Sequence, residues 1–364
     1  MEGSPLKYFL VFVIGAIIGT GLFWLYLWIN ENTSIIDDSK SLIKKEENKF
    51  ILQKKVAAWL PWWDQDNAFR SLKRNKDKIS TLKPVWYEVE KDASIKKYTD
   101  AENEEIIEFA KENKIKIIPV ITNNCEPYES QIVLSNKDLR EKHIENIISL
   151  VEKYDYDGIE PNYECLDGWQ YRKPFSDFMT QLSQEMRNRK KLISTSVHAK
   201  TSDRGEWEGP EAQDWKVLNE VCDQIKLMTY DYHWSTSDAG DIAPISWVEE
   251  ILTYAVGVID KEKLYLGIPF YGYDWKGELA KDLVYRDVLE LLERYKSEVK
   301  ISSEKEKYFN YREDGDLHTI YYFDRETIGE RIDLVNKYDI AGIGIWRLGQ
   351  EDSKNWQTIE EKFK

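Results

Sequence analysis

The stretch DGIEPNYE, residues 157–164, places an acid or an amide at every second position of a predicted β-strand. Because side chains alternate across a strand, Glu160, Asn162 and Glu164 share one face. Three polar groups on one face of a buried strand cost several kcal/mol unless they line a site that uses or satisfies them. The stretch is therefore the first indication of a catalytic site.

The same residues are also compatible with a solvated edge strand or a loop. Pro161 has no backbone N–H to donate to a neighbouring strand, and Gly158 favours a bend. The rest of the chain must distinguish these two interpretations.

Short apolar, strand-like runs recur along the chain, and amphipathic segments with helical spacing separate them. The predicted strands are Val56–Leu60, Pro84–Val89, Ile115–Ile121, Gly158–Glu164, Leu192–His198, Gln224–Tyr230, Leu264–Phe270 and Gly342–Trp346. The predicted helices are Glu104–Asn113, Leu139–Tyr154, Phe175–Arg189, Ala212–Cys222, Ser246–Val256 and Thr327–Tyr338. Eight strands that alternate with helices predict an α/β fold in which parallel strands close into a (β/α)8 TIM barrel. We expect this barrel to occupy residues 51–364.

The last unit of the predicted barrel is longer than the others. Between the seventh and eighth strands, residues 272–323 contain a helical segment, Asp287–Lys296, and two strand-like pieces, Lys307–Tyr311 and His318–Phe323. We expect these residues to form a small α+β insertion before the eighth strand.

The N-terminal part of the chain has a different character. Residues 8–29 are uncharged and would reach about 33 Å as a helix, which matches the thickness of a bilayer core. The residues that follow do not form a small-x-small cleavage site, so we expect one retained transmembrane anchor rather than a signal peptide. Residues 1–7 form a short tail before it, and the polar residues 30–50 are expected to be a linker. The basic residues near the anchor do not decide its orientation.

Composition limits the classes of partner. The net charge of −15 argues against a nucleic-acid partner, because phosphate binding requires clustered basic residues. Three cysteines are too few for a disulfide framework, but Cys125 and Cys165 each follow a predicted strand and could form one bridge. Cys222 is expected in the core. The His and Cys residues show no zinc-binding spacing, so we expect neither a metal nor another cofactor.

The carboxyl ends of the strands carry the reacting groups in a TIM barrel, and Glu164 ends the predicted fourth strand. Other predicted strand ends carry residues suited to binding a sugar, namely Trp59, Trp86, Tyr87, Met228, Tyr230, Asp231, Trp234, Tyr271 and Trp346. Flat aromatic faces with a few polar groups are typical of a polysaccharide cleft, although several of these aromatic residues could instead fill the core. His198 is expected to line the cleft without acting as a catalytic base.

Four segments resemble the family 18 glycoside hydrolases, which include chitinases and bacterial cell-wall N-acetylglucosaminidases. Residues 157–164 resemble the family motif DGxDxDxE, and residues 228–231 (MTYD) resemble MxYD. Residues 266–272 (LGIPFYG) and residues 342–346 (GIGIW), which end in Trp346, resemble the seventh and eighth strands of the family. The segments occur in the family order, so the resemblance covers the whole predicted barrel and its insertion.

The resemblance implies a retaining mechanism in which the 2-acetamido group of the substrate attacks the anomeric carbon. Glu164 would be the general acid and later the general base, and Asn162 would hold the acetamido N–H. Tyr230 and Asp231 would position the acetamido carbonyl, and Trp346 would form the floor beneath the sugar. The expected catalytic set is Glu164, Asn162, Asp157, Tyr230 and Asp231. The expected substrate-binding set is Trp346, Glu160, Met228, Trp59, Trp86, Tyr87, Tyr271, Trp234 and His198.

Three residues of the motif depart from the family pattern. Asn162 replaces the usual Asp, Glu160 replaces another acid, and Pro161 replaces an aliphatic residue. An Asn can accept a hydrogen bond from the acetamido N–H, as in the Asn-x-Glu pair of related endo-β-N-acetylglucosaminidases, but it offers no charge to a cationic intermediate. Loss of that charge would lower the rate by about two to three orders of magnitude.

Two functions therefore stay open. The chain is either a membrane-anchored, outward-facing β-N-acetylglucosaminidase acting on peptidoglycan or a chitin-like glycan, or a catalytically silent chitinase-like protein. The silent protein would bind a glycan, or a protein partner, through the same cleft.

Overall fold

The computed structural model describes residues 52–364, except residues 124, 126–127 and 167. The predicted tail, transmembrane anchor and linker, residues 1–50, lie outside the described residues. Among the helices of the described part, none combines the length and the apolar character needed to span a bilayer.

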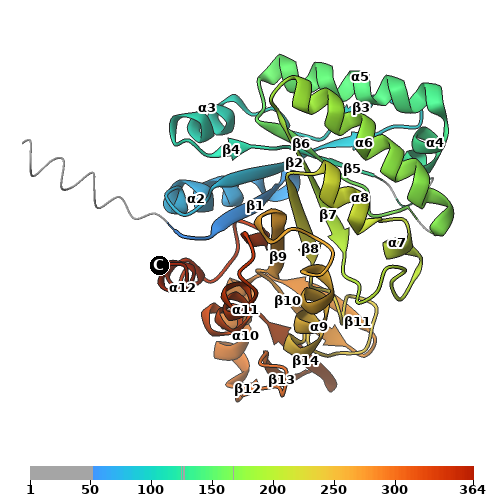
Figure 1. Cartoon of the computed structure of the whole chain (residues 1–364). Helices are drawn as coiled ribbons and strands as arrows, with labels where there is room; N and C mark the ends of the chain where they lie inside the picture. Colours follow the sequence, from blue (N-terminus) through green and yellow to red (C-terminus); the bar gives the residue numbers. More distant parts are fainter. Residues whose placement is uncertain (1–51, 124, 126–127, 167) are drawn as a thin grey trace, which may run out of the picture. The chain divides into compact units, whose positions relative to one another are not determined.

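Parallel strands form the closed barrel that the alternation of elements predicts (Figure 1). In order around the barrel they are β1 (Lys55–Pro61), β15 (Gly342–Trp346), β9 (Leu264–Pro269), β8 (Gln224–Met228), β7 (Leu192–His198), β6 (Gly158–Asn162), β5 (Val120–Thr122) and β2 (Thr81–Val89). Pairing of β1 with β2 closes the ring. The predicted third strand is divided, because the short β4 (Lys116–Ile117) and β5 pair separately with β2. An additional strand, β3 (Ile95–Lys97), pairs antiparallel with β2.

Helices connect successive strands and cover the outside of the barrel (Figure 1). The α-helices are α2 (Gln65–Asn75), α3 (Glu104–Glu112), α4 (Glu129–Ser135), α5 (Lys137–Tyr154), α6 (Arg172–Asn188), α7 (Glu208–Glu211), α8 (Trp215–Val221), α9 (Ile245–Ala255), α11 (Arg325–Tyr338) and α12 (Asn355–Lys362). Short 3-10 helices are η1 (Trp62–Asp64), η2 (Trp169–Tyr171) and η3 (Lys261–Lys263). All six predicted helices are confirmed. Several of them start at the side-chain caps that polar residues provide, namely Asn103, Asn136 and Asp324.

The predicted insertion is a separate five-stranded antiparallel sheet between β9 and β15. Its elements are β10 (Gly272–Lys276), β11 (Leu279–Leu283), α10 (Tyr285–Tyr295), β12 (Lys300–Ile301), β13 (Lys307–Glu313) and β14 (Asp316–Tyr322), which Figure 1 shows grouped together. The predicted helix and two predicted strands correspond to α10, β13 and β14. The sequence does not reveal β11 and β12, because most of their side chains are exposed and give no apolar alternation.

The insertion also has its own small core. Leu283, Val288, Phe309 and Ile320 pack together between α10 and the sheet.

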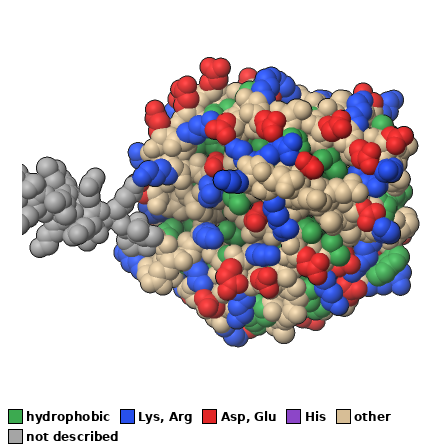
Figure 2. Space-filling model, turned by 45° about the horizontal axis from the view of Figure 1, so that its top comes forward, with side chains coloured by type: hydrophobic (Ala, Val, Ile, Leu, Met, Phe, Trp, Pro, Cys, Tyr) green, Lys and Arg blue, Asp and Glu red, His purple; other side chains and the backbone are tan. Residues whose placement is uncertain are grey.

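On the face of the molecule shown in Figure 2, acidic and basic side chains are interspersed over the surface.

Strand β6 is an interior strand of the barrel, so the edge-strand interpretation of the motif is wrong. It pairs with β5 and β7, and every residue in it is buried. The carbonyl of Pro161 accepts a hydrogen bond from the Thr195 hydroxyl of β7 at 3.0 Å, at a position where proline cannot donate to the sheet. Gly158 permits a close strand approach rather than a bend, because a Cβ there would lie 2.4 Å from the carbonyl oxygen of Leu192.

Candidate active site

The interior of the barrel holds a buried ionic cluster around Glu160. The Nζ atoms of Lys83 and Lys226 lie 2.5 and 3.0 Å from its Oε2 atom, and all three side chains are fully buried. Three further donors complete the shell of the carboxylate, at 2.5 to 3.1 Å: Trp59, Ser194 and Ser196. Burial alone would raise the pKa of Glu160, but Lys226 and Lys83 outweigh it and hold that pKa well below its ordinary value. Glu160 is therefore a fixed anion of the core.

At the carboxyl end of β6, the side chains of Asn162 and Glu164 are in contact. Asn162 Nδ2 donates a hydrogen bond to Glu164 Oε1 at 2.8 Å. The Oδ1 atom of Asn162 is buried and has no hydrogen-bond partner among the described residues. An unpartnered buried acceptor is costly, so its presence beside a half-buried carboxylate indicates a place where a ligand donates an N–H or O–H group.

The backbone of Glu164 lies beyond the end of β6 and is held by side chains. Its N–H donates to Asn123 Oδ1 at 2.9 Å, and its carbonyl accepts from His198 Nε2 at 2.9 Å. Asn123 follows β5 and His198 ends β7, so the two strands that flank β6 supply these contacts.

A second carboxylate, Asp231, lies across the cleft from this pair. The hydroxyls of Tyr271 and Tyr273 both donate to its Oδ1 atom, Tyr273 at 3.0 Å. Asp231 is open to the cleft, yet the protein around it displaces bulk water and raises its pKa against the opposing effect of the two hydroxyls. Its φ of 58° lies in the left-handed region and turns the chain after β8.

Tyr230 lies beside Asp231 and packs against β9. A Cβ at Gly267 would lie 2.9 Å from the Tyr230 ring, so glycine at this position leaves room for the ring. Burial raises the pKa of Tyr230 well above its ordinary value, so its hydroxyl keeps its proton at neutral pH. That hydroxyl has no protein partner among the described residues, and it is available to donate to a ligand.

These groups open into one long cleft at the carboxyl ends of the strands. The part that contains Glu164 has a volume of about 620 Å³ and is lined by His198, Trp207, Met228, Tyr230, Asp231 and Trp234. An adjoining part of about 140 Å³ shares Asp231 and is lined by Trp63, Tyr271, Tyr273, Trp346 and Arg347. Trp63, Trp207 and Trp234 are each about half exposed, so their ring faces are free for a ligand. The polar groups thus lie between aromatic walls, an arrangement typical of a sugar-binding cleft.

Eight of the predicted site residues line this cleft: Glu164, His198, Met228, Tyr230, Asp231, Trp234, Tyr271 and Trp346. A ninth, Asn162, is buried and donates a hydrogen bond to Glu164. Their chemical roles stay predictions.

Five other predicted site residues do not line the cleft. Asp157 precedes β6 at the opposite end of the barrel, where its Oδ2 atom accepts the N–H of Ile117 at 2.8 Å. It lies about 16 Å along the strand from Asn162, too far to touch the same sugar. It therefore fixes the start of β6 instead of joining the catalytic groups.

The remaining four, Trp59, Glu160, Trp86 and Tyr87, are at most 1% exposed. Trp59 donates to Glu160 inside the barrel, whereas Trp86 binds Gln65 and Tyr87 binds Tyr156. No surface is left on these side chains for a glycan, so the structure corrects their assignment to substrate binding. They follow the strand-end pattern in sequence but face the core.

Sequence reasoning missed Asn123 and Trp207. Asn123 follows a predicted strand, so the strand-end rule applied to the third strand would have found it. Trp207 lies in a loop without periodicity and gave no signal beyond being aromatic. The possible bridge between Cys125 and Cys165 is confirmed, and it links the loops that follow β5 and β6, next to Glu164. Cys222 is buried, as predicted.

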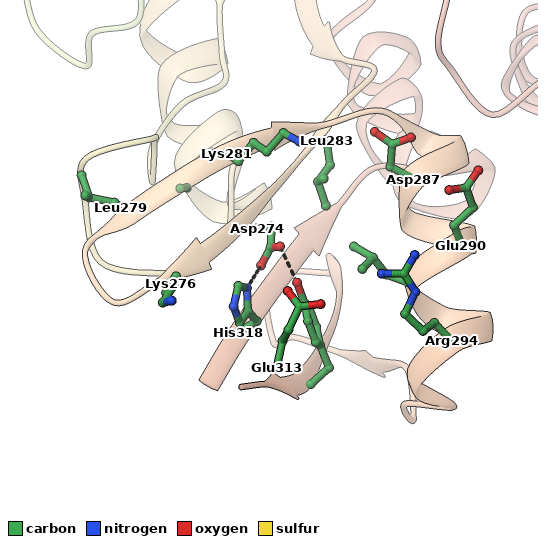
Figure 3. Close-up of a pocket in the computed structure, with 13 residues that line it drawn as sticks. Asp274, Lys276, Leu279, Lys281, Leu283, Asp287, Glu290, Arg294, Glu313 and His318 are labelled. Atoms are coloured by element: carbon green, nitrogen blue, oxygen red, sulfur yellow. Dashed lines mark hydrogen bonds and ion pairs between the residues drawn. The ribbon is translucent and has the colours of Figure 1, made fainter. Parts of the chain in front are cut away.

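A second hollow of about 550 Å³ lies on the insertion, between its sheet and α10 (Figure 3). Asp274 accepts hydrogen bonds there from His318 at 2.9 Å and from Tyr311 at 2.7 Å. Side chains of both charges, including Lys276 and Arg294, surround this group. None of the predicted site residues lies in this hollow, so we place the candidate active site in the barrel cleft.

Within the described part of the chain, no group of His, Cys, Asp and Glu side chains has an arrangement that could hold a metal ion.

Known sequences resemble this chain over most of the barrel. The model of the glycosyl hydrolases family 18 matches residues 26–351. An uncharacterized glycosylase of Bacillus subtilis, YvbX, is 28% identical over 269 residues, which are 70% of this chain and 77% of that protein. The cortical fragment-lytic enzyme of Bacillus cereus is 26% identical over 289 residues, which are 76% of this chain and 66% of that protein. The chain therefore spans slightly less than two thirds of the latter relative.

Solved structures share the fold at lower identity. A chitinase from Chromobacterium violaceum superposes with a TM-score of 0.79 at 23% identity, covering 85% of this chain and 98% of that one. The spore cortex-lytic enzyme SleL of Bacillus cereus superposes with a TM-score of 0.79 at 24% identity, covering 85% of this chain and 74% of that one. These similarities establish the barrel fold. The reaction must be inferred from the residues of this cleft.

Proposed function

From the premise that the chain belongs to the glycosyl hydrolases family 18, we propose that its barrel hydrolyses β-linked N-acetylglucosamine glycans, either peptidoglycan or a chitin-like polymer, with retention of configuration. One observation carries the proposal. The carboxylate of Glu164 lies in a cleft with Tyr230 and Asp231, and it is hydrogen-bonded to Asn162, whose buried Oδ1 atom has no partner among the described residues.

In the proposed reaction, Glu164 donates a proton to the glycosidic oxygen as the bond from that oxygen to the anomeric carbon breaks. The acetamido oxygen of the same sugar forms the new bond to the anomeric carbon and gives a cyclic oxazolinium intermediate. Glu164, now a carboxylate, then takes a proton from water, and the water oxygen opens the ring. No nucleophile from the protein is needed, which suits a cleft whose second carboxylate, Asp231, is engaged by two tyrosine hydroxyls.

Asn162 fits the part of holding the acetamido group. Its Nδ2 atom is already committed to Glu164, so the Oδ1 atom is left to accept the acetamido N–H. That hydrogen bond would turn the acetamido oxygen toward the anomeric carbon, while Tyr230 donates to the same oxygen. Asn162 supplies orientation without charge, so we expect slower turnover than an aspartate at this position would give.

The names of the relatives support both glycans, because a chitinase and a spore cortex-lytic enzyme superpose equally well on this chain. A cortical fragment-lytic enzyme and a spore cortex-lytic enzyme both resemble this chain over most of its length. The chain covers only part of each of these proteins, so their whole-protein activities enter here as support for the substrate class alone.

We also propose that the barrel works outside the cytoplasm, tethered by a transmembrane helix over residues 8–29. The length and apolar character of that run support the anchor. The disulfide between Cys125 and Cys165 supports an outward-facing barrel, because disulfides persist in oxidising compartments. Digestion of the barrel by a protease added to intact cells, or its labelling by a membrane-impermeant reagent, tests this topology. A barrel that is reached only after cell lysis would contradict the outward-facing orientation.

The activity is tested on the whole chain in detergent with N-acetylglucosamine oligomers and purified peptidoglycan. We expect turnover that Glu164→Gln lowers by at least about 100-fold, because the amide cannot donate the proton. Equal and near-zero rates for both forms, together with saturable binding of the oligomers, would instead identify the silent chitinase-like binder. The absence of Asp at position 162 is the observation that favours that second candidate.

A further inference from the structure

The catalytic candidate Glu164 follows β6 but is not part of its hydrogen-bonded ladder, since the strand ends at Asn162. Its two backbone polar groups are bound instead by side chains from the neighbouring strand ends. We propose that Asn123 and His198 are positioning residues that together hold the Glu164 carboxylate at the scissile bond. This inference rests on the proposed function for its kinetic consequences, but the geometry that it assigns can be measured without turnover.

Asn123 is oriented by contacts at both ends of its amide. Its Oδ1 atom accepts the N–H of Glu164 at 2.9 Å and lies 3.4 Å from the N–H donor of Cys165. Its Nδ2 atom donates to the hydroxyl of Ser130 at 2.8 Å. Exchanging the two ends of the amide would turn its NH2 group toward the N–H groups of Glu164 and Cys165, so these two donors fix its orientation.

His198 holds the other side of the same segment. A carbonyl oxygen can only accept, so the Nε2 atom of His198 carries the hydrogen that binds the Glu164 carbonyl at 2.9 Å. The backbone N–H of His198 donates to Gln213 Oε1 at 2.7 Å. The ring of Trp207 meets the imidazole edge-on at a centroid separation of 4.6 Å, which restricts rotation of the imidazole.

The two contacts bind the N–H and the carbonyl of one residue, on either side of the Glu164 Cα atom, and so fix the start of its side chain. The far end of that side chain is fixed by the hydrogen bond from Asn162. Removing either backbone contact frees the segment to shift by a fraction of an ångström or more, because no sheet ladder replaces it. A displacement of about 1 Å at a reacting group costs about 100-fold in rate.

The deciding experiment compares variants that keep or remove the donor at position 198. His198→Phe keeps an aromatic ring against Trp207 but cannot donate, whereas His198→Gln keeps an N–H donor. We expect His198→Phe to lower kcat by about 10- to 100-fold with KM changed by less than about threefold, and His198→Gln to recover most of the loss. Asn123→Ala should lower kcat to a similar degree. His318→Phe is the matched control, because it makes the same replacement in the insertion, away from the cleft.

A crystal structure of each variant gives the second readout. In His198→Phe and Asn123→Ala, the hydrogen bond between Asn162 Nδ2 and Glu164 Oε1 should be lost or the Glu164 carboxylate displaced, and in His198→Gln both should be retained. A normal kcat and an unmoved carboxylate in His198→Phe overturn the inference while leaving the proposed function intact. A change confined to KM also overturns it, because His198 would then act by binding substrate. If the unaltered protein turns over no glycan, the proposed function fails and the position of the carboxylate alone decides the inference.

Discussion

Replacing Glu160 with glutamine should lower the free energy of unfolding of the barrel more than the loss of any single neutral hydrogen bond in its core would. The change preserves size and shape but removes the one carboxylate that lies between Lys83 and Lys226. All three side chains are fully buried, so water cannot take the place of the lost charge. The amide would also turn an N–H group toward donors that now bind a carboxylate oxygen.

The expected loss follows from the charges that remain. Burial and the charge of Lys83 lower the pKa of Lys226 well below its ordinary value, so Lys226 can shed its proton when its partner is removed. At least one buried lysine charge is then left without a counter-charge in the cluster. Removing one partner of a buried ion pair costs about 3–5 kcal/mol. For a barrel of this size the corresponding fall in Tm is about 5–8 °C.

Equilibrium unfolding in urea at pH 7, followed by tryptophan fluorescence and circular dichroism, measures the loss. Ser196→Ala is the matched control, because it removes one neutral donor to the same carboxylate, 3.1 Å away, and should cost about 1 kcal/mol. The triple change Glu160→Met, Lys83→Met and Lys226→Met should recover most of the stability, since a well-packed apolar replacement of a buried ionic cluster is often neutral.

A loss below about 1 kcal/mol for Glu160→Gln, no larger than the Ser196→Ala control, would refute this reasoning. It would mean that the lysines are neutral in the folded barrel or that water enters the cluster. A triple variant less stable than Glu160→Gln would likewise contradict the view that uncompensated charge is the source of the cost.

Three further predictions concern the cleft and the groups beside it. Asn162→Asp should raise kcat on N-acetylglucosamine oligomers by up to about 100-fold, because the carboxylate stabilises the cationic intermediate, and an unchanged or lower kcat would show that the missing charge does not limit the rate. Burial lowers the pKa of His143 from 6.5 to about 4, so between these pH values the unfolded chain binds a proton at His143 and the folded chain does not. The contribution of His143 to the free energy of unfolding should be complete above pH 6.5 and should fall by about 3 kcal/mol as the pH drops to 4. In urea unfolding, the free energy of unfolding of His143→Phe should decrease less over that pH range. Replacing Cys125 and Cys165 with alanine opens a loop of 40 residues and should cost up to about 4 kcal/mol of unfolding free energy, whereas a reductant should destabilise the unaltered protein and leave the double variant unchanged.

Much of the fold could be predicted because it depends on local patterns. Strand and helix periods, their alternation, and the order of four short motifs predict the barrel, its insertion and the strand that precedes Glu164, although this strand ends at Asn162 rather than at Glu164 as predicted. The exposed strands of the insertion escaped this reasoning, because a strand with little buried surface has no apolar alternation to detect.

The site was predictable in part. The expectation that reacting groups gather at the carboxyl ends of the strands placed Glu164, Asp231 and Trp346 in one cleft, and all three line it in the structure, where Asn162 donates a hydrogen bond to Glu164. The same rule placed Trp86 and Tyr87 there wrongly, because it identifies the strand but does not fix which face a residue near a strand irregularity presents. The pairing of β2 with β5 shifts its register between Val85 and Tyr87, where these aromatic side chains turn to the core.

By itself the sequence determined which strand carries the acid and which residue types accompany it, because alternation along a strand is a property of neighbouring residues. The tertiary structure decided the depth at which each polar group of that strand lies. Asp157, Glu160 and Glu164 belong to one short motif, yet the first fixes the bottom of the barrel, the second is a buried anion and the third opens into the cleft. The partners that make this difference come from far along the chain, since Lys83 and Lys226 lie 77 and 66 residues from Glu160. Folding alone brings such charges together, so their effect cannot be read from the motif.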